Sequence, residues 1–217
     1  GDSVSACTAV KDLGVIIDPS LSFESHVNNI TRIAFFHLRN IAKIRNMIIR
    51  PFLSTQAAQV LVQSLVISRL DYCIFLLAGL PLNAIRPLQI IQNAAARLVF
   101  NQHKFSHTTP LLRSLHWLPV AAFIRFKTLM LVYKAKNGPA PSYLSDPFTL
   151  CTAPCCLRSS STARLVPPSL RMRGKYTSRL FSVLATRWCN DLPLDVRTAE
   201  SLTIFKRRLK TYLFLKH

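Results

Sequence analysis

The segment SFESHVNNITRIAFFHLRNIAKIRNMII, residues 22–49, carries the most regular apolar pattern in the sequence. Ser22 is a suitable N-cap, and Pro51 ends the pattern because a residue before proline avoids the helical conformation. The segment therefore predicts one long amphipathic helix. Its expected inward positions alternate by three and four: Val27, Ile30, Ala34, His37, Ile41, Ile44 and Ile48.

Working outward, residues 10–17 predict a short strand interrupted by Gly14. Further helices are expected over residues 54–70, 83–100, 119–136 and 198–216. In the helix expected over residues 83–100, Pro87 is acceptable only if it lies in the first turn. The sequence thus indicates a mainly α fold, a helical bundle with a short N-terminal strand or hairpin.

Composition divides the chain into three regions. Residues 1–138 form a helical part, and residues 177–217 form a basic C-terminal segment that ends in a helix. Residues 139–176 are rich in proline, serine and cysteine and predict an extended connector. Residues 177–190 fit neither the helical nor the strand period cleanly, so either structure stays open.

The chain has 28 Lys and Arg but only 9 Asp and Glu among 217 residues, a net charge of +19. Half of the residues are hydrophobic, which is enough for a core and argues against disorder. The longest apolar run, residues 72–82, is too short for a membrane span of about 20 residues. A charge excess of this kind points to a polyanionic partner, most often nucleic acid, with an anionic membrane surface as the alternative.

The cations gather on two predicted helices. At 100° per residue, those of the first helix fall within about 40° of one another and opposite its apolar stripe. A solvated face usually pairs Lys with Glu four residues away, and these helices have almost no such pairs. We therefore favour phosphate contact over simple solvation. The candidate residues are Arg32, Arg39, Lys43 and Arg50 on the first helix, with Lys206, Arg207, Arg208 and Lys210 on the last.

Catalytic and metal sites find little support. The acids are scattered, and five glycines cannot assemble a nucleotide-binding loop. His103 and His107 have the HxxxH spacing but lie in a loop-like context, and the CxxxCC cluster of residues 151–156 lacks an evident fourth ligand. Trp117 and Trp188 could stack on bases, although packing in the core is the stronger interpretation. We expect no catalytic residue, metal or cofactor in this chain.

The six cysteines are irregularly spaced, and no signal peptide precedes them. Free thiols and an intracellular location, nuclear or cytoplasmic, are therefore expected. The sequence opens with Gly1 rather than Met, which suggests a piece of a longer product.

Six strings in this order resemble the C-terminal part of reverse transcriptases from non-LTR (LINE-type) retrotransposons of the jockey-like group, as found in fish genomes. The resemblance covers essentially the whole chain. The strings are VKDLGVIIDPSLSFESHVNNI at residues 10–30, SRLDYC at 68–73, LQIIQNAAARLVF at 88–100, LHWLPV at 115–120, LVYKAKNGPAPSYLSD at 131–146 and FKRRLKTYLF at 205–214.

In that family the first string marks the start of the thumb, and a helical extension follows it. The resemblance implies a fragment of an RNA-directed DNA polymerase that grips the template–primer duplex beside an upstream polymerase domain. The family's Tyr-x-Asp-Asp palm motif, which binds Mg²⁺, does not occur here, so no catalytic residue is carried over. The positions that match the thumb-start pattern are Leu13, Gly14, Val15, Asp18, Leu21, Ser22, Phe23 and His26.

Two other classes of function remain open. The chain could be a helical protein-interaction module whose charge is incidental, or an inactive remnant of a decayed mobile element. Sequence-specific base readout is not supported, because no known reading module is recognisable.

Overall fold

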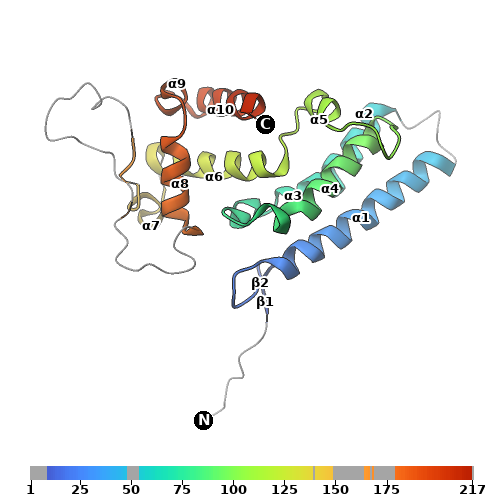
Figure 1. The fold of residues 1–217 in the computed structure, drawn as a ribbon, viewed down its shortest axis with the longest axis horizontal. Coiled ribbons are helices and arrows are strands. Elements are labelled where there is room, and N and C mark those ends of the chain that lie inside the picture. Colours follow the sequence, from blue (N-terminus) through green and yellow to red (C-terminus); the bar gives the residue numbers. More distant parts are fainter. Residues whose placement is uncertain are drawn as a thin grey trace, which may run out of the picture. The chain divides into compact units, whose positions relative to one another are not determined.

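The computed structural model describes residues 9–47, 54–138, 140–148, 164–166, 168 and 179–216. This part of the chain is mainly helical and opens with one two-stranded hairpin, so the predicted fold class is confirmed (Figure 1). The strands are β1 (Val10–Asp12) and β2 (Val15–Ile17). The helices are α1 (Glu24–Met47), α2 (Thr55–Val62), the π-helix η1 (Gln63–Ile67), α3 (Ser68–Asp71), the 3₁₀-helix η2 (Ile74–Leu77), α4 (Leu82–Val99), α5 (Thr109–Ser114), α6 (Val120–Asn137), α7 (Ser142–Ser145), α8 (Phe181–Asn190), α9 (Leu194–Arg197) and α10 (Leu202–Lys216).

The chain divides into two compact units, Gly1–Val120 and Ala121–His217. The division falls at the start of α6, whereas the composition change places a boundary after residue 138. Helix α6 therefore belongs with the elements that follow it.

The hairpin of the first unit gives the Leu-Gly-Val string of residues 13–15 a structural role. Leu13 and Gly14 form its two-residue turn with φ of 44° and 87°, the left-handed values that a type I′ turn needs. The hydroxyl of Tyr72 donates to the carbonyl of Leu13 at 2.6 Å and so fixes the turn to the end of α3. Val15 is buried at 4 % exposure.

The junction between β2 and α1 is organised by Asp18. Its carboxylate accepts the backbone N–H groups of Ser22 and Phe23 at 2.9 and 2.8 Å, and also the hydroxyl of Ser20. The Ser20 hydroxyl, together with these N–H groups, lowers the pKa of Asp18 well below its usual range. Leu21 and Phe23 have φ of 49° and 56°, so the carboxylate stabilises a turn that L-residues rarely adopt.

Helix α1 begins at Glu24, and the hydroxyl of Ser22 accepts the N–H of that residue at 3.3 Å. Phe23 therefore occupies the N-cap position. Ser22, which the sequence predicts as the N-cap, lies one residue earlier. His26 in the first turn is buried at 3 % exposure, and its Nδ1 accepts the N–H of Ile16 at 3.3 Å. The helix is therefore fastened to the hairpin by a neutral imidazole.

Helix α1 lies along α4 and also contacts α2 and η1 (Figure 1). The predicted stripe is right at four of its positions, Val27, Ile30, Ala34 and Ile41, all buried. It is wrong at His37 and Ile44, which are half-buried and exposed. Leu38 and Arg45 are buried in their place, and Ile48 lies outside the described residues.

The next two predicted helices are present with local differences. Residues 55–71 run through α2, η1 and α3, so a π-helical segment interrupts the expected α-helix. Ser54 is the N-cap of α2, with its hydroxyl accepting the N–H of Ala57 at 3.1 Å. In α4, Pro87 is the sixth residue and not part of the first turn, so the expectation for it is wrong. Pro87 has no N–H to donate to the carbonyl of Asn83, four residues earlier, and the helix nevertheless continues to Val99.

The second unit is built around α6. Val132 and Ala135 of this helix form a core with Phe148, Leu165 and Ala185. Leu165 belongs to the predicted connector, yet it is only 1 % exposed, and both its backbone groups bond the Asn190 side chain at 2.9 Å. Of the range 177–190, for which helix and strand were both open, residues 181–190 form the helix α8.

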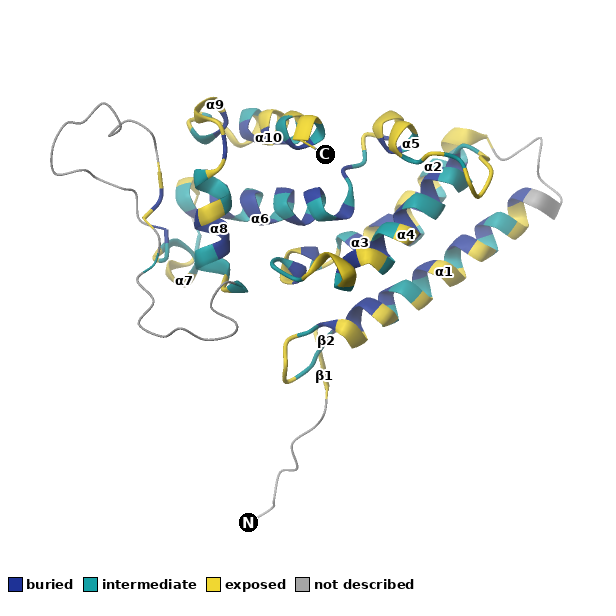
Figure 2. Ribbon diagram, viewed as in Figure 1, coloured by how far each residue is buried: buried dark blue, intermediate teal, exposed yellow. Residues whose placement is uncertain are grey.

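Helix α10 packs against the same unit. The ring of Tyr133 stacks on Phe205 at 4.4 Å, and its hydroxyl donates to the carbonyl of Ala199 at 2.9 Å. The helix begins at Leu202 and not at Thr198, because the short helix α9 occupies residues 194–197. Its buried stripe is Phe205, Leu209 and Leu213. Figure 2 colours the buried and exposed residues of this helix.

Candidate nucleic-acid interface

The exposed face of α1 carries the cations that the sequence singles out. Arg32, Arg39 and Lys43 are all exposed, and they lie within about 40° of one another on the face opposite the buried stripe (Figure 2). Successive members are about 10 and 6 Å apart along the helix axis. We call these three residues the α1 basic stripe. Arg50, the fourth predicted member, lies outside the described residues.

The α1 basic stripe has no acidic partner among the residues that the structure describes. Arg32 donates to the Asn29 side-chain oxygen at 3.4 Å, and neither Arg39 nor Lys43 forms an ion pair within that part of the chain. Glu24 is the one acid of α1 and lies about 12 Å along the axis from Arg32. The three positive charges are therefore free to meet an external anion.

Arg45 belongs to the same helix but serves the fold. It is only 9 % exposed, and its Nη1 donates to the carbonyl oxygens of Leu98, by a short contact, and of Val99, at 3.0 Å. These carbonyls belong to the last turn of α4, where carbonyls lack intrahelical donors, and that of Leu98 also accepts the N–H of Asn101 at 3.2 Å. A cation there also faces the negative end of the helix dipole. Arg45 thus closes the C-terminal end of α4.

The cations of α10 do not form one face. Lys206 and Arg207 are exposed, while Arg208 donates to the backbone carbonyl of Asp195. Lys210 is half-buried, with its Nζ 5.8 Å from the centre of the Phe214 ring, and burial lowers its pKa, with a smaller effect from Lys206. The four side chains also spread over about 200° of the helix. They are a weaker candidate than the α1 basic stripe.

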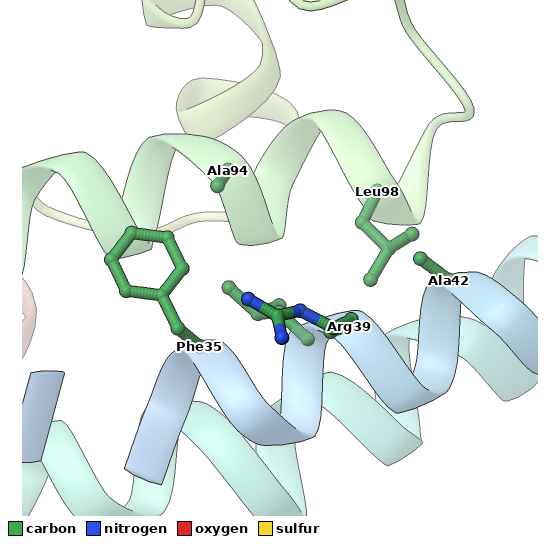
Figure 3. A pocket seen from close by; sticks show the side chains of 6 residues that line it. Phe35, Arg39, Ala42, Ala94 and Leu98 are labelled. Atoms are coloured by element: carbon green, nitrogen blue, oxygen red, sulfur yellow. The ribbon is translucent and has the colours of Figure 1, made fainter. Parts of the chain in front are cut away.

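Beside the α1 basic stripe lies a groove that the sequence analysis does not predict. It has a volume of about 260 Å³ and lies between α1 and α4. Figure 3 shows the ring of Phe35 standing at one end, the Arg39 guanidinium extending toward it, and small side chains across from them. The groove is lined by Phe35, Leu38, Arg39, Ala42, Ala94 and Leu98.

A signal for this groove exists in the sequence. Phe35 and Phe36 fall outside the buried stripe, on either side of Arg39, and are 38 % and 61 % exposed. Two adjacent phenylalanines beside an uncompensated arginine are unusual for a solvated helix face. The other wall could not be foreseen, because Ala94 and Leu98 come from a helix more than 50 residues further along the chain.

The other candidates add no second site. His103 and His107 are exposed in the loop before α5, and no group of three or more His, Cys, Asp or Glu side chains is placed to hold a metal ion within the described ranges. The CxxxCC cluster lies outside those ranges. Trp117 and Trp188 are both half-buried, and Trp188 packs 5.7 Å from the Arg125 guanidinium.

Comparisons with protein-family models, curated proteins and solved structures find no match to this chain. In the part that the structure describes, no helix is both long and apolar enough to cross a membrane. The indications of function are therefore the geometry of the α1 basic stripe and the ordered strings of the sequence.

Proposed function

We propose that this chain binds nucleic acid through the sugar–phosphate backbone, with the α1 basic stripe as the main contact. The observation that carries the proposal is the set of three exposed cations on one helix face, none of them paired with a carboxylate of the described residues. Such cations replace the counterions condensed on a polyanion, and their release drives association. Contacts of this kind position a duplex without reading its sequence.

The resemblance to LINE-type reverse transcriptases gives this binding a context. In that context the chain is a thumb and post-thumb segment that holds the template–primer while a separate palm, with its Mg²⁺ ions, performs the polymerisation. The chain itself then binds the template–primer and contributes no catalytic group. Its partners would be an RNA or RNA–DNA duplex and the upstream polymerase domain, in the nucleus or cytoplasm.

The thumb-start positions support only the structural half of that context. Leu13 and Gly14 make a turn, Asp18 and Ser22 secure the start of α1, and His26 is buried against β2. These residues aim α1 and are not themselves ligands for nucleic acid. In the proposed function they hold the basic face of the helix in place.

The test is a salt titration of binding to a primed RNA–DNA duplex, measured by fluorescence anisotropy. The triple variant Arg32→Gln, Arg39→Gln, Lys43→Gln should reduce the slope of log affinity against log salt by roughly 2 to 3, because three phosphate contacts are lost. The matched control removes the same charge from exposed cations elsewhere in the first unit: Arg86→Gln, Lys104→Gln, Arg113→Gln. Its slope should change little.

Three results would contradict the proposal. Equal slope changes in both triple variants would mean that net charge, and not the α1 basic stripe, controls binding. No binding at 20 mM salt would favour the protein-interaction module or the inactive remnant. Selective co-sedimentation with anionic vesicles instead of nucleic acid would favour a membrane surface.

A further inference from the structure

The groove between α1 and α4 owes its shape to the size of its side chains. Ala42 on α1 and Ala94 on α4 end at Cβ, while Phe35 and Leu98 project beyond them (Figure 3). Leu38, only 6 % exposed, forms the base. A hollow of about 260 Å³ therefore remains where larger residues would have closed the helix interface.

The lining combines apolar surface with a single cation. Phe35 offers an aromatic ring, the leucine and alanine side chains offer aliphatic surface, and Arg39 is the one charged group. A guanidinium can stack on a flat ring or bond a phosphate. An aliphatic occupant would use the apolar walls but would leave Arg39 without a role.

The surroundings of the groove determine the charge of its occupant. Arg39 belongs both to the groove and to the α1 basic stripe, with Arg32 about 20° and Lys43 about 40° from it around the helix. Any molecule whose ring enters the groove therefore places its remaining part against three uncompensated positive charges. An aromatic ring joined to phosphates satisfies both conditions.

The size of the groove limits how much can enter. Its volume of about 260 Å³ is below the roughly 300–1,000 Å³ typical of pockets for drug-sized ligands. One flat ring system fits, and a stacked base pair does not. Because a duplex keeps its base faces covered, only an unstacked base can use the Phe35 ring.

Building on the proposed function, we propose that this groove receives one unstacked base of a single-stranded nucleic acid. The base packs between Phe35 and the aliphatic wall of α4, while Arg39, Arg32 and Lys43 hold the adjoining phosphates. The occupant is thus a single strand, or a single-stranded end of a duplex, and not the duplex interior. Recognition is by stacking and charge, so it is tolerant of sequence.

The experiment compares a labelled (dT)₁₂ with an abasic 12-mer of the same charge, by anisotropy, on the full chain. Phe35→Ala should weaken (dT)₁₂ binding roughly 5- to 150-fold, as expected for the loss of one stacked base. Binding of the abasic strand should not change. Ala94→Leu fills the groove without altering the charge, so it should also weaken (dT)₁₂ binding and leave binding of the abasic strand unchanged. Circular dichroism checks that this variant is folded.

The matched control is Phe75→Ala in η2, since Phe75 is 39 % exposed and Phe35 is 38 % exposed. This variant should leave the ratio of (dT)₁₂ to abasic affinity at the wild-type value. Free dTMP should bind far more weakly than the 12-mer, because it presents one phosphate to three cations.

The failures of the two proposals are distinguishable. If Phe35→Ala and Ala94→Leu both keep the wild-type affinity ratio while the α1 triple variant still reduces the salt slope, the base-binding groove is wrong and backbone binding stands. If dTMP binds as tightly as (dT)₁₂, the groove is a nucleotide site and the single-strand assignment is wrong. If neither strand binds at low salt, both proposals fail together.

Discussion

At the scale of single residues, the cations of α1 divide into two kinds that composition cannot separate. Arg45 is buried and donates hydrogen bonds to the last carbonyls of α4. Lys43, two positions earlier, is exposed and forms no ion pair with the described residues. The difference follows from helix phase. Position 45 lies on the buried stripe and position 43 lies on the opposite face.

Removing Arg45 should therefore destabilise the first unit. Arg45→Met is expected to lower the free energy of unfolding by about 1.5–3 kcal/mol, because two charge-assisted bonds are lost and the carbonyl of Val99 loses the donor described for it. Urea unfolding would be followed by fluorescence in a Trp188→Phe background, so that Trp117 alone reports this unit. Lys43→Met is the control and should fall within about 0.5 kcal/mol of wild type. Equal losses in both variants would contradict the capping role.

His26 should make stability depend on pH near neutrality. Burial lowers the pKa of its imidazole below the ordinary 6.5, so the folded chain holds the neutral form and unfolding takes up a proton. The stabilisation is complete above about pH 6.5 and is lost as pH falls from there toward the folded-state pKa, by at most about 1.4 kcal/mol per pH unit.

Urea midpoints measured from pH 7.5 to 5.5 would check this prediction, with His26→Gln expected to flatten the curve. If the His26→Gln variant keeps the wild-type pH dependence, another group causes the effect.

Asp18 affects stability in a separate, more acidic pH range. Because hydrogen bonding lowers its pKa, chiefly through Ser20, its contribution is lost only as pH falls below about 4.

At the scale of elements, the start of α2 offers a clean test of local sequence control. Ser54 accepts the N–H of Ala57 at the N-cap, while the hydroxyl of Ser64 only bonds back to the carbonyl of Leu61. Ser54→Ala should cost about 0.5–2 kcal/mol of stability, measured by thermal unfolding. Ser64→Ala should be neutral or slightly stabilising, because alanine is the better helix former. Similar losses from both would show that α2 is held by packing alone.

The stripe of α1 shows how far periodicity can predict an element. An alternation of three and four follows a period of 3.5, whereas a straight helix turns once every 3.6 residues and drifts by about 20° per heptad. The prediction is therefore right at four positions and one residue early at two. Leu38 is buried in place of His37, and Arg45 in place of Ile44. The existence of the helix, its exposed cations and its phase at the start were all predictable.

The groove was not predictable for a different reason. It depends on Ala42 of α1 and Ala94 of α4 lining the same space, and a sequence pattern describes each helix only by itself. The π-helix η1 and the burial of Leu165 likewise depend on tertiary packing. Local chemistry, such as the Asp18 turn and the Ser54 cap, is where the sequence was most informative.

At the scale of the whole molecule, charge acts on folding and on binding with opposite signs. A net charge of +19 makes the folded chain repel itself, and salt shortens the Debye length from about 30 Å at 0.01 M to about 8 Å at 0.15 M. Salt should therefore raise the melting temperature of the free protein. The same salt weakens any complex with a polyanion, because released counterions return to a more concentrated solution.

The two triple variants separate these effects. Each lowers the net charge by three, from +19 to +16, so both should show the same reduced gain in melting temperature between 0.02 and 0.3 M NaCl. Only the variant of the α1 basic stripe should also lose part of the salt dependence of binding. A melting temperature that falls with salt would mean that attractive ion pairs outweigh self-repulsion. Because net charge is shared by the whole surface and phosphate contact is confined to one helix face, equal effects on stability with unequal effects on binding locate the interface on α1.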